Sequence, residues 1–303
     1  MKKLFTFILI TILSMQTHAA NISQETLAKA QAVIDKAVEA FGGKDKLTAL
    51  KQMQIASDVT DTANGQSLKP DPPWDKSDSS VFNAIDFDKK IYVNSFYRND
   101  DGGEFSNKNI NNGENSLRVD LIDKTFSNYK ATPEDFMQVA GPFIRVTTPL
   151  LIKQLMQRAD TSTYLGEVSF NNKPHDVTRF VMEAGPAISL YFDKATHLLS
   201  KSERVLPFGL VEYYFGDYKM IDGVLFNQYY RLTFEGLDNT EQTNTISAIN
   251  QPIDKHLVVD KSFKKMSEIV ANEFKIEELD EGVFFVGNAN TYHLFVDMGD
   301  YLI

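Results

Sequence analysis

Residues 188–234 read ISLYFDKATHLLSKSERVLPFGLVEYYFGDYKMIDGVLFNQYYRLTF and decide the fold. Three turn sequences divide this stretch: residues 193–196, residues 206–209, and Asp222-Gly223, a dipeptide typical of two-residue hairpins. Between the turns, apolar Val211, Tyr213 and Phe215 alternate with Glu212 and Tyr214. Alternation of this kind gives a sheet one apolar face and one face that can meet water. The stretch therefore predicts consecutive antiparallel strands.

The composition of the whole chain fits a strand-rich globular protein. Of its 303 residues, 43% are hydrophobic and 12% are aromatic, chiefly Phe (22) and Tyr (12), which favours a pleated sheet over an all-helical fold. The formal charge of −10 argues against a nucleic-acid partner, because a phosphate backbone would be repelled. The absence of cysteine excludes disulfides, thiolate zinc sites, cysteine nucleophiles and a lipid-attachment cysteine.

The amino terminus has the pattern of a signal peptide. Met1-Lys2-Lys3 is basic, residues 4–13 are almost entirely apolar, and Thr17-His18-Ala19 places small residues at the cleavage positions. The apolar run is well short of the ~20 residues that span a bilayer. We therefore expect a signal peptide over residues 1–19, cleavage near Ala19, and an exported protein, periplasmic or secreted, without a transmembrane span in the mature chain.

The mature chain divides into a long first part and a short second part. An amphipathic helix is expected from Ser23 to a stop at Gly42-Gly43, with apolar positions at Leu27, Ala30, Ile34, Ala37, Val38 and Phe41. Thr132-Pro133 and Thr148-Pro149 are typical helix starts. A Pro-rich loop over residues 64–80 carries the single tryptophan, Trp74. We expect a sheet domain over residues 20–254, a linker over 255–273 with one helix at 263–270, and a further segment over 274–303. Strands are expected at residues 53–59, 81–87, 90–97, 116–122, 163–170 and 175–183, as several strands within 188–234, and at 246–250. In the last segment, short strands are expected at residues 274–277, 283–286 and 293–296 and from Tyr301 onward.

Three segments carry a resemblance to a known family. They are AFGGKDKLTALKQMQI from Ala40, YFDKATHLLSKSE from Tyr191 and YYFGDYKMIDGVLFNQYYRL from Tyr213. Residues 40–250 thereby resemble the bacterial lipoprotein carriers (LolA/LolB-like). The resemblance implies an α+β fold in which an antiparallel curved sheet, a half-barrel, wraps around covering helices.

The last thirty residues carry a second resemblance. Residues 278–286 (ELDEGVFFV) and 293–301 (HLFVDMGDY) resemble the first two strands of the metallo-β-lactamase fold. This resemblance implies an exported protein of the metallo-β-lactamase-like hydrolase type, of whose αββα domain this chain contains only the beginning. The family's zinc motif, His-x-His-x-Asp-His, is absent, and no two of the five histidines have metal-binding spacing. We expect no catalytic residue, metal ligand or cofactor in this chain, with zinc only in full-length relatives; whether the protein is an enzyme stays open.

Other polar groupings suggest acid/base or cation sites only weakly. His175-Asp176 and His256 lie beside turn or linker sequences, so solvated side chains explain them better than catalysis. A set of aspartates lacks the spacing of a calcium loop, and a hydrated acidic surface is the stronger interpretation. These aspartates are Asp58, Asp61, Asp71, Asp75 and Asp78.

The alternative function is a binding module that holds a lipid or another hydrophobic small molecule in the concave face of the sheet. The residues expected there are Phe143, Ile144, Leu150, Leu151, Leu155 and Met156, with Trp74 as a cap. Helices that merely fill the concave face would show the same apolar stripe, and Trp74 would then simply pack its loop onto the sheet. The sequence identifies neither the ligand nor the oligomeric state.

Overall fold

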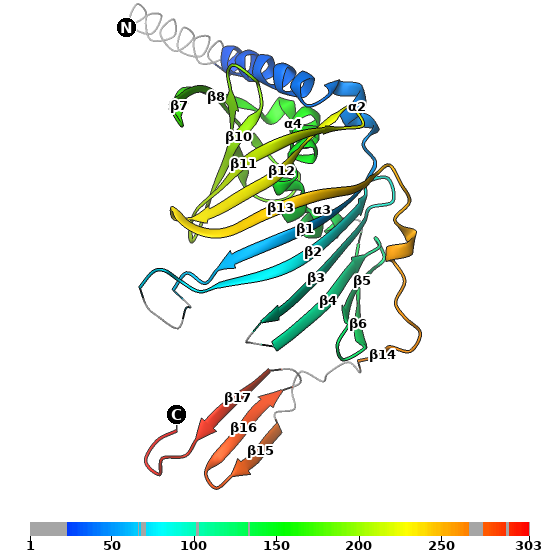
Figure 1. The fold of residues 1–303 in the computed structure, drawn as a ribbon, viewed down its shortest axis with the longest axis vertical. Helices are drawn as coiled ribbons and strands as arrows, with labels where there is room; N and C mark the ends of the chain where they lie inside the picture. The colour runs from blue at the N-terminus through cyan, green and yellow to red at the C-terminus, as the bar shows by residue number, and fades with distance from the viewer. Residues whose placement is uncertain are drawn as a thin grey trace, which may run out of the picture.

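The computed structural model describes residues 23–65, 67, 71–100, 103–132, 134–266, 275–288 and 291–302. The signal peptide expected over residues 1–19 lies outside this range. The described part is built around a large, open, curved sheet of fourteen strands in the order β14-β6-β5-β4-β3-β2-β1-β13-β12-β11-β10-β9-β8-β7 (Figure 1). All neighbours are antiparallel except β14 and β6.

The sheet consists of two meanders that meet at the centre. The first meander contains β1 (Gln52–Thr62), β2 (Lys76–Asp86), β3 (Ile91–Asp100), β4 (Gly103–Asn111), β5 (Asn115–Asp120) and β6 (Thr125–Lys130). The second contains β7 (Thr163–Phe170), β8 (Lys173–Val181), β9 (Ala187–Asp193), β10 (Leu199–Leu206), β11 (Gly209–Ile221), β12 (Val224–Phe234) and β13 (Leu237–Ile249). Pairing of β1 with β13, with Met53 opposite Ile249, joins the two meanders into one sheet.

The antiparallel strands predicted for residues 188–234 are confirmed as β9 to β12. The Asp193 carboxylate accepts hydrogen bonds from the backbone N–H groups of Ala195 and Thr196 at 2.8 and 3.0 Å, which fixes the first turn. In the last turn, Asp222 and Gly223 have φ angles of 51° and 79°. Both values are positive, as a two-residue hairpin of this type requires.

Several strands were not predicted from the sequence. They are β4, β6, β14 and most of β13, of which only residues 246–250 were expected. The loop expected over residues 64–80 is also wrong at residues 76–80, which are the first part of β2. In β13 the residues that face the helices include Gln242 and Asn244, which are buried although polar. A strand with polar residues on both faces lacks the alternation from which strands are predicted.

The helices lie on the concave side of the sheet. A helix over residues 23–40 leads into α2 (Gly43–Ala49), while α3 (Asp135–Val146) and α4 (Thr148–Gln157) connect the two meanders (Figure 1). Pro149 is in the first turn of α4, as its sequence predicts. The described part also contains two 3₁₀ turns, η1 (Ala159–Thr161) and η2 (Asp254–His256).

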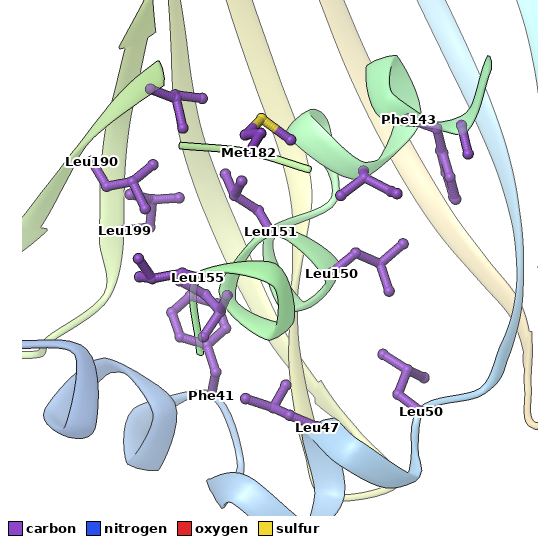
Figure 2. Packing of buried hydrophobic residues seen from close by; sticks show 14 of the residues in the cluster. Phe41, Leu47, Leu50, Phe143, Leu150, Leu151, Leu155, Met182, Leu190 and Leu199 are labelled. Carbon is purple, nitrogen blue, oxygen red and sulfur yellow. The ribbon is translucent and has the colours of Figure 1, made fainter. Parts of the chain in front are cut away.

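The main core forms between these helices and the sheet. Phe41, Leu47 and Leu50 from the amino-terminal segment meet Leu150, Leu151 and Leu155 of α4, and Leu190 and Leu199 lie on the strands around them (Figure 2). Of the apolar positions predicted for the first helix, Ala30, Ile34, Ala37, Val38 and Phe41 are buried, whereas Leu27 is exposed. Burial of apolar side chains is the largest favourable contribution to the stability of a folded protein.

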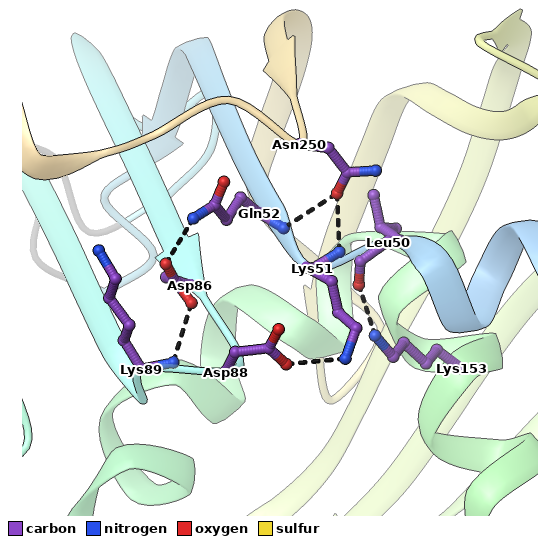
Figure 3. Close-up of polar contacts among 8 residues, drawn as sticks. All are labelled: Leu50, Lys51, Gln52, Asp86, Asp88, Lys89, Lys153 and Asn250. Carbon is purple, nitrogen blue, oxygen red and sulfur yellow. Dashed lines mark hydrogen bonds and ion pairs between the residues drawn. The ribbon is translucent and has the colours of Figure 1, made fainter.

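A polar cluster fastens the start of β1 to its neighbours (Figure 3). The Asn250 side-chain oxygen accepts hydrogen bonds from the backbone N–H groups of Lys51 and Gln52 at 2.8 and 3.3 Å. The Lys51 ammonium pairs with Asp88 at 2.7 Å. On the α4 side, Lys153 Nζ donates to the carbonyl oxygen of Leu50 at 2.5 Å. Leu50 is the C-cap of α2, so Lys153 satisfies a carbonyl at a helix end.

Residues 253–266 cross the convex face of the first meander. Ile253 is buried against Ala84, Ile91, Val93 and Ile110. The chain then reaches the far edge of the sheet, where β14 (Lys264–Lys265) pairs with β6. The prediction of a helix over residues 263–270 is therefore wrong for the described residues, 263–266. The backbone of β14 instead forms hydrogen bonds with the edge strand β6.

A separate sheet of three antiparallel strands consists of β15 (Lys275–Asp280), β16 (Val283–Asn288) and β17 (Thr291–Val296). Strands were expected at these places, and a bridge between Asp297 and Leu302 follows them. The described strands do not amount to an αββα fold, and the metallo-β-lactamase architecture is not supported by them.

Candidate binding groove beside helix α3

Most residues expected to bind a ligand instead form the core. Phe143, Ile144, Leu150, Leu151 and Leu155 are at most 5% exposed, and Met156 packs against the same cluster while partly buried. Figure 2 shows Leu150, Leu151 and Leu155 pointing into the packed interior. The helices therefore occupy this part of the concave face. Trp74 is half-buried on the segment that precedes β2.

An open groove remains between α3 and the concave face of the first meander. It has a volume of about 450 Å³ and is lined by Tyr92, Asn94, Asn109, Asn111 and Ser116 of the sheet and by Gln138, Val139 and Pro142 of α3. The strand register explains the sheet side of this lining, because Tyr92 pairs with Asn111 and Asn94 with Asn109 on adjacent strands. Paired residues point to the same face of a sheet. The volume lies within the range typical of small-molecule sites, ~300–1,000 Å³.

The α3 side of the groove combines polar Gln138 with two apolar residues, Val139 and Pro142. Val139 is 38% exposed although it lies on the helix that also carries the buried Phe136, Ala140 and Phe143. Pro142 lies three residues further along the same exposed face. The Phe143 ring packs against Tyr92, with ring centroids 5.8 Å apart. An apolar ligand can thus lie along Val139 and Pro142 without displacing the core.

The sheet side supplies polar groups. The Asn83 side-chain oxygen accepts hydrogen bonds from the Tyr92 hydroxyl at 2.7 Å and from the Asn94 amide at 3.0 Å. Burial raises the pKa of Tyr92, so its hydroxyl remains a protonated donor. The Asn111 side-chain nitrogen is buried and has no hydrogen-bond partner among the described residues. A buried donor without a partner is costly unless a ligand or water satisfies it.

A second polar network was not anticipated from the sequence. On the concave face near the centre of the sheet, Gln242 Nε2 donates to Ser57 Oγ at 3.0 Å and the Tyr230 hydroxyl donates to Gln242 Oε1 at 2.8 Å. Asn227 accepts from the backbone N–H and the hydroxyl of Thr148, both at 3.0 Å, and so holds the start of α4. The only indication of this network in the sequence is the presence of polar residues at positions of β12 and β13 that face the concave side of the sheet.

A groove of about 520 Å³ lies at the side of the sheet opposite the helices. Its lining includes Asp58, Thr60, Asp78 and Glu241, and the Thr60 hydroxyl donates to Asp78 at 2.6 Å. Two of the aspartates noted in the sequence therefore lie together. Because carboxylates strongly favour hydration, this acidic surface suits an apolar ligand poorly.

The histidines do not form a site with one another in the described part of the chain. The expectation that His175 is solvated is wrong: it is 2% exposed, and its ring nitrogens lie 3.0 Å from the Lys173 carbonyl oxygen and 2.9 Å from Ser200 Oγ. His256 stacks on Phe82 and bonds to Gln54 at 2.9 Å, because the chain folds back over the sheet. His293 is exposed.

Neither a metal cluster nor a membrane-spanning helix is present in the described part of the chain. Across the residues that the structure covers, no group of three or more His, Cys, Asp or Glu side chains is placed to hold a metal ion. Within the same residues, no helix combines the length and apolar character needed to cross a bilayer.

Comparison with known proteins finds solved structures that are similar to this chain but assigns it to no family. No family model matches the sequence, and no curated protein matches it. The chain is similar to a putative outer membrane lipoprotein-sorting protein domain from Vibrio parahaemolyticus, with 12% identity and a TM-score of 0.47 over 75% of this chain and 97% of that one.

Two more solved structures are similar over 76% of this chain and 97% of theirs. One is a DUF1329 family protein from Desulfovibrio piger, with 12% identity and a TM-score of 0.45. The other is a LolA superfamily protein from Nitrosomonas europaea, with 11% identity and a TM-score of 0.45. The metallo-β-lactamase resemblance of residues 278–301 finds no support in these comparisons or in the structure.

Proposed function

We propose that this protein is an exported binding module that holds a hydrophobic small molecule or lipid in the groove between α3 and the concave face of β3–β5. The observation that carries the proposal is the lining of this groove. Exposed apolar Val139 and Pro142 lie opposite polar residues of the sheet, among which the buried amide nitrogen of Asn111 has no hydrogen-bond partner in the described residues. Ligand sites commonly combine apolar walls with a few polar groups that fix orientation.

The binding site differs from the one expected from the sequence. The apolar residues of α4 are buried in the core. The ligand therefore lies on the exposed side of α3 rather than beneath the helices. The hydrolase hypothesis has no comparable feature in its favour, since no arrangement of catalytic groups was found in the part of the chain that the structure describes. We therefore place the binding hypothesis ahead of it.

Binding of a neutral hydrophobic dye, N-phenyl-1-naphthylamine, to the purified chain tests this proposal. Dye fluorescence should rise on binding, and Val139→Glu should reduce the affinity by about tenfold or more, because a carboxylate in the groove must be desolvated when the dye enters. Val205→Glu is the matched control, since Val205 is 73% exposed on β10 and should tolerate the same change.

Equal dye affinity of the two variants would contradict the assignment of the groove. Failure of the unmodified chain to bind any neutral hydrophobic probe would contradict the proposed function itself. Urea unfolding of both variants separates a loss of binding from a loss of folding.

A further inference from the structure

One side of helix α3 carries a row of residues that are exposed or half-buried. Gln138, Val139 and Pro142 are exposed and Arg145 is half-buried, and their spacing places them on one side of the helix. From Gln138 to Arg145 the row is about 10 Å long at 1.5 Å per residue. Arg145 therefore lies on the same side of α3 as Val139 and Pro142, about one turn beyond the residues that line the groove.

Arg145 does not stand alone at this end of the helix. Arg204 on β10 donates a hydrogen bond to the Tyr213 hydroxyl at 3.3 Å, and the same tyrosine interacts with Arg145. The Arg145 guanidinium lies close to Gly141 and Gly185: a Cβ atom added at either glycine would contact it. Two guanidinium groups from different elements thus converge on Tyr213, which is only 4% exposed.

The charge of this pair is not neutralised by the protein. Within the described residues, neither Arg145 nor Arg204 forms an ion pair with a carboxylate. Arg231, by contrast, pairs with Asp238 at 2.8 Å. Burial lowers the pKa of Arg145, and the neighbouring charge of Arg204 lowers it further. This concentration of positive charge occurs in a protein whose formal charge is −10.

Both arginines also have an unused donor. The Nε atoms of Arg145 and Arg204 are buried and have no hydrogen-bond partner among the described residues. Ser202 lies opposite Tyr213 in the pairing of β10 with β11. Its Oγ atom is buried and likewise has no hydrogen-bond partner among the described residues. Guanidinium groups are matched in geometry to carboxylate and phosphate oxygens, which accept two hydrogen bonds at once.

We infer that Arg145, Arg204 and Tyr213 bind the anionic head group, a carboxylate or a phosphate monoester, of an amphiphile whose apolar chain lies along Val139 and Pro142. This inference rests on the proposed binding function and specifies its ligand class. The anion neutralises the arginine pair, and the groove buries the chain. Selectivity for a single-chain acid over its neutral ester follows from this arrangement.

The test compares cis-parinaric acid with its methyl ester, both of which fluoresce when bound, on the full chain. The acid should bind about tenfold more tightly than the ester, in line with charged hydrogen bonds in partly buried sites. Arg145→Gln and Arg204→Gln should each lower the affinity for the acid toward that of the ester. Arg231→Gln, which removes an exposed ion-paired arginine, is the control.

Competition distinguishes the sources of the anion. Dodecyl phosphate should displace the acid at far lower concentration than inorganic phosphate, because only the former fills the groove. Equal potency would mean a site for free anions and would overturn the amphiphile assignment. Equal affinity for acid and ester would overturn the anionic head group while leaving the proposed function intact, whereas absence of binding for both would overturn the two together. Thermal unfolding confirms that each variant is folded.

Discussion

The Phe143 ring on α3 packs against the Tyr92 ring on β3, with centroids 5.8 Å apart, at the inner boundary of the groove. On one side of this contact lies the core, in which Phe143 is 5% exposed. On the other side lie the groove residues Val139 and Pro142. The contact therefore sets the separation between α3 and the sheet and makes the groove a feature of the folded core.

Replacement of Phe143 tests whether this contact holds α3 in place. We expect Phe143→Ala to lower the free energy of unfolding by about 3–5 kcal/mol, since a large buried aromatic is removed from a packed site. Val139→Ala, on the exposed side of the same helix, should change it by less than about 0.5 kcal/mol. Urea denaturation measures both values, and similar costs for the two variants would contradict the arrangement described here.

The close approach of Gly42 to Gly223 gives a second prediction. Gly42 has a φ of 118°, and a Cβ atom at this position would overlap the carbonyl oxygen of Gly223 in the β11–β12 turn. Gly236 also has a positive φ, 78°, but a Cβ there meets nothing within 4 Å. Gly236→Ala should therefore cost only about 1–2 kcal/mol of backbone strain.

Gly42→Ala should cost clearly more than Gly236→Ala, because the backbone must move in addition to adopting a strained angle. Thermal unfolding of the two variants under the same conditions measures the difference. Equal shifts of the melting temperature would show that the amino-terminal helix does not dock on the β11–β12 turn as described.

The buried ammonium group of Lys153 makes the stability of the protein depend on pH. Lys153 is 6% exposed, and burial, assisted by the charge of Lys51, lowers its pKa to about 8 from 10.5. Between these values the unfolded chain binds more protons than the folded one, so stability rises with pH. Relative to Lys153→Met, the unmodified protein should gain stability from pH 8 to pH 10.5 and show a constant difference below pH 8.

Urea unfolding of both proteins at several pH values checks this expectation. Lys36→Met, which removes an exposed lysine from the first helix, controls for the loss of one charge. A difference between Lys153→Met and the unmodified protein that stays constant from pH 7 to pH 10.5 would contradict the burial of this ammonium group.

Local patterns in the sequence were sufficient to predict β9 to β12 and the start of α4, whereas α3 begins at Asp135, after the Thr132-Pro133 start that was expected. Turn residues such as Asp222 and Gly223, and the proline at the start of α4, act within a few residues of their own position. The apolar stripe of α4 also predicted a helix that fills the concave face, and its leucines do so.

The groove could not be predicted, because it depends on contacts between distant segments. Asn94 and Asn109 become neighbours only through the pairing of β3 with β4, and β4 was not expected. Arg145 and Arg204 meet across 59 positions of sequence, and neither belongs to a motif. Gln242 and Asn244 lie in a part of β13 for which no strand was expected, so no local pattern indicated that these polar side chains are buried and that Gln242 donates a hydrogen bond to Asn244.

Photo-crosslinking tests the central claim most directly. A fatty acid with a diazirine in its chain is bound to the full protein, irradiated, and the attachment sites are mapped by mass spectrometry. We predict attachment to Gln138, Val139, Pro142 and Asn109 around the groove. Attachment mainly to Asp58, Asp78 and Tyr97 in the acidic groove, or evenly over the surface, would contradict binding beside α3.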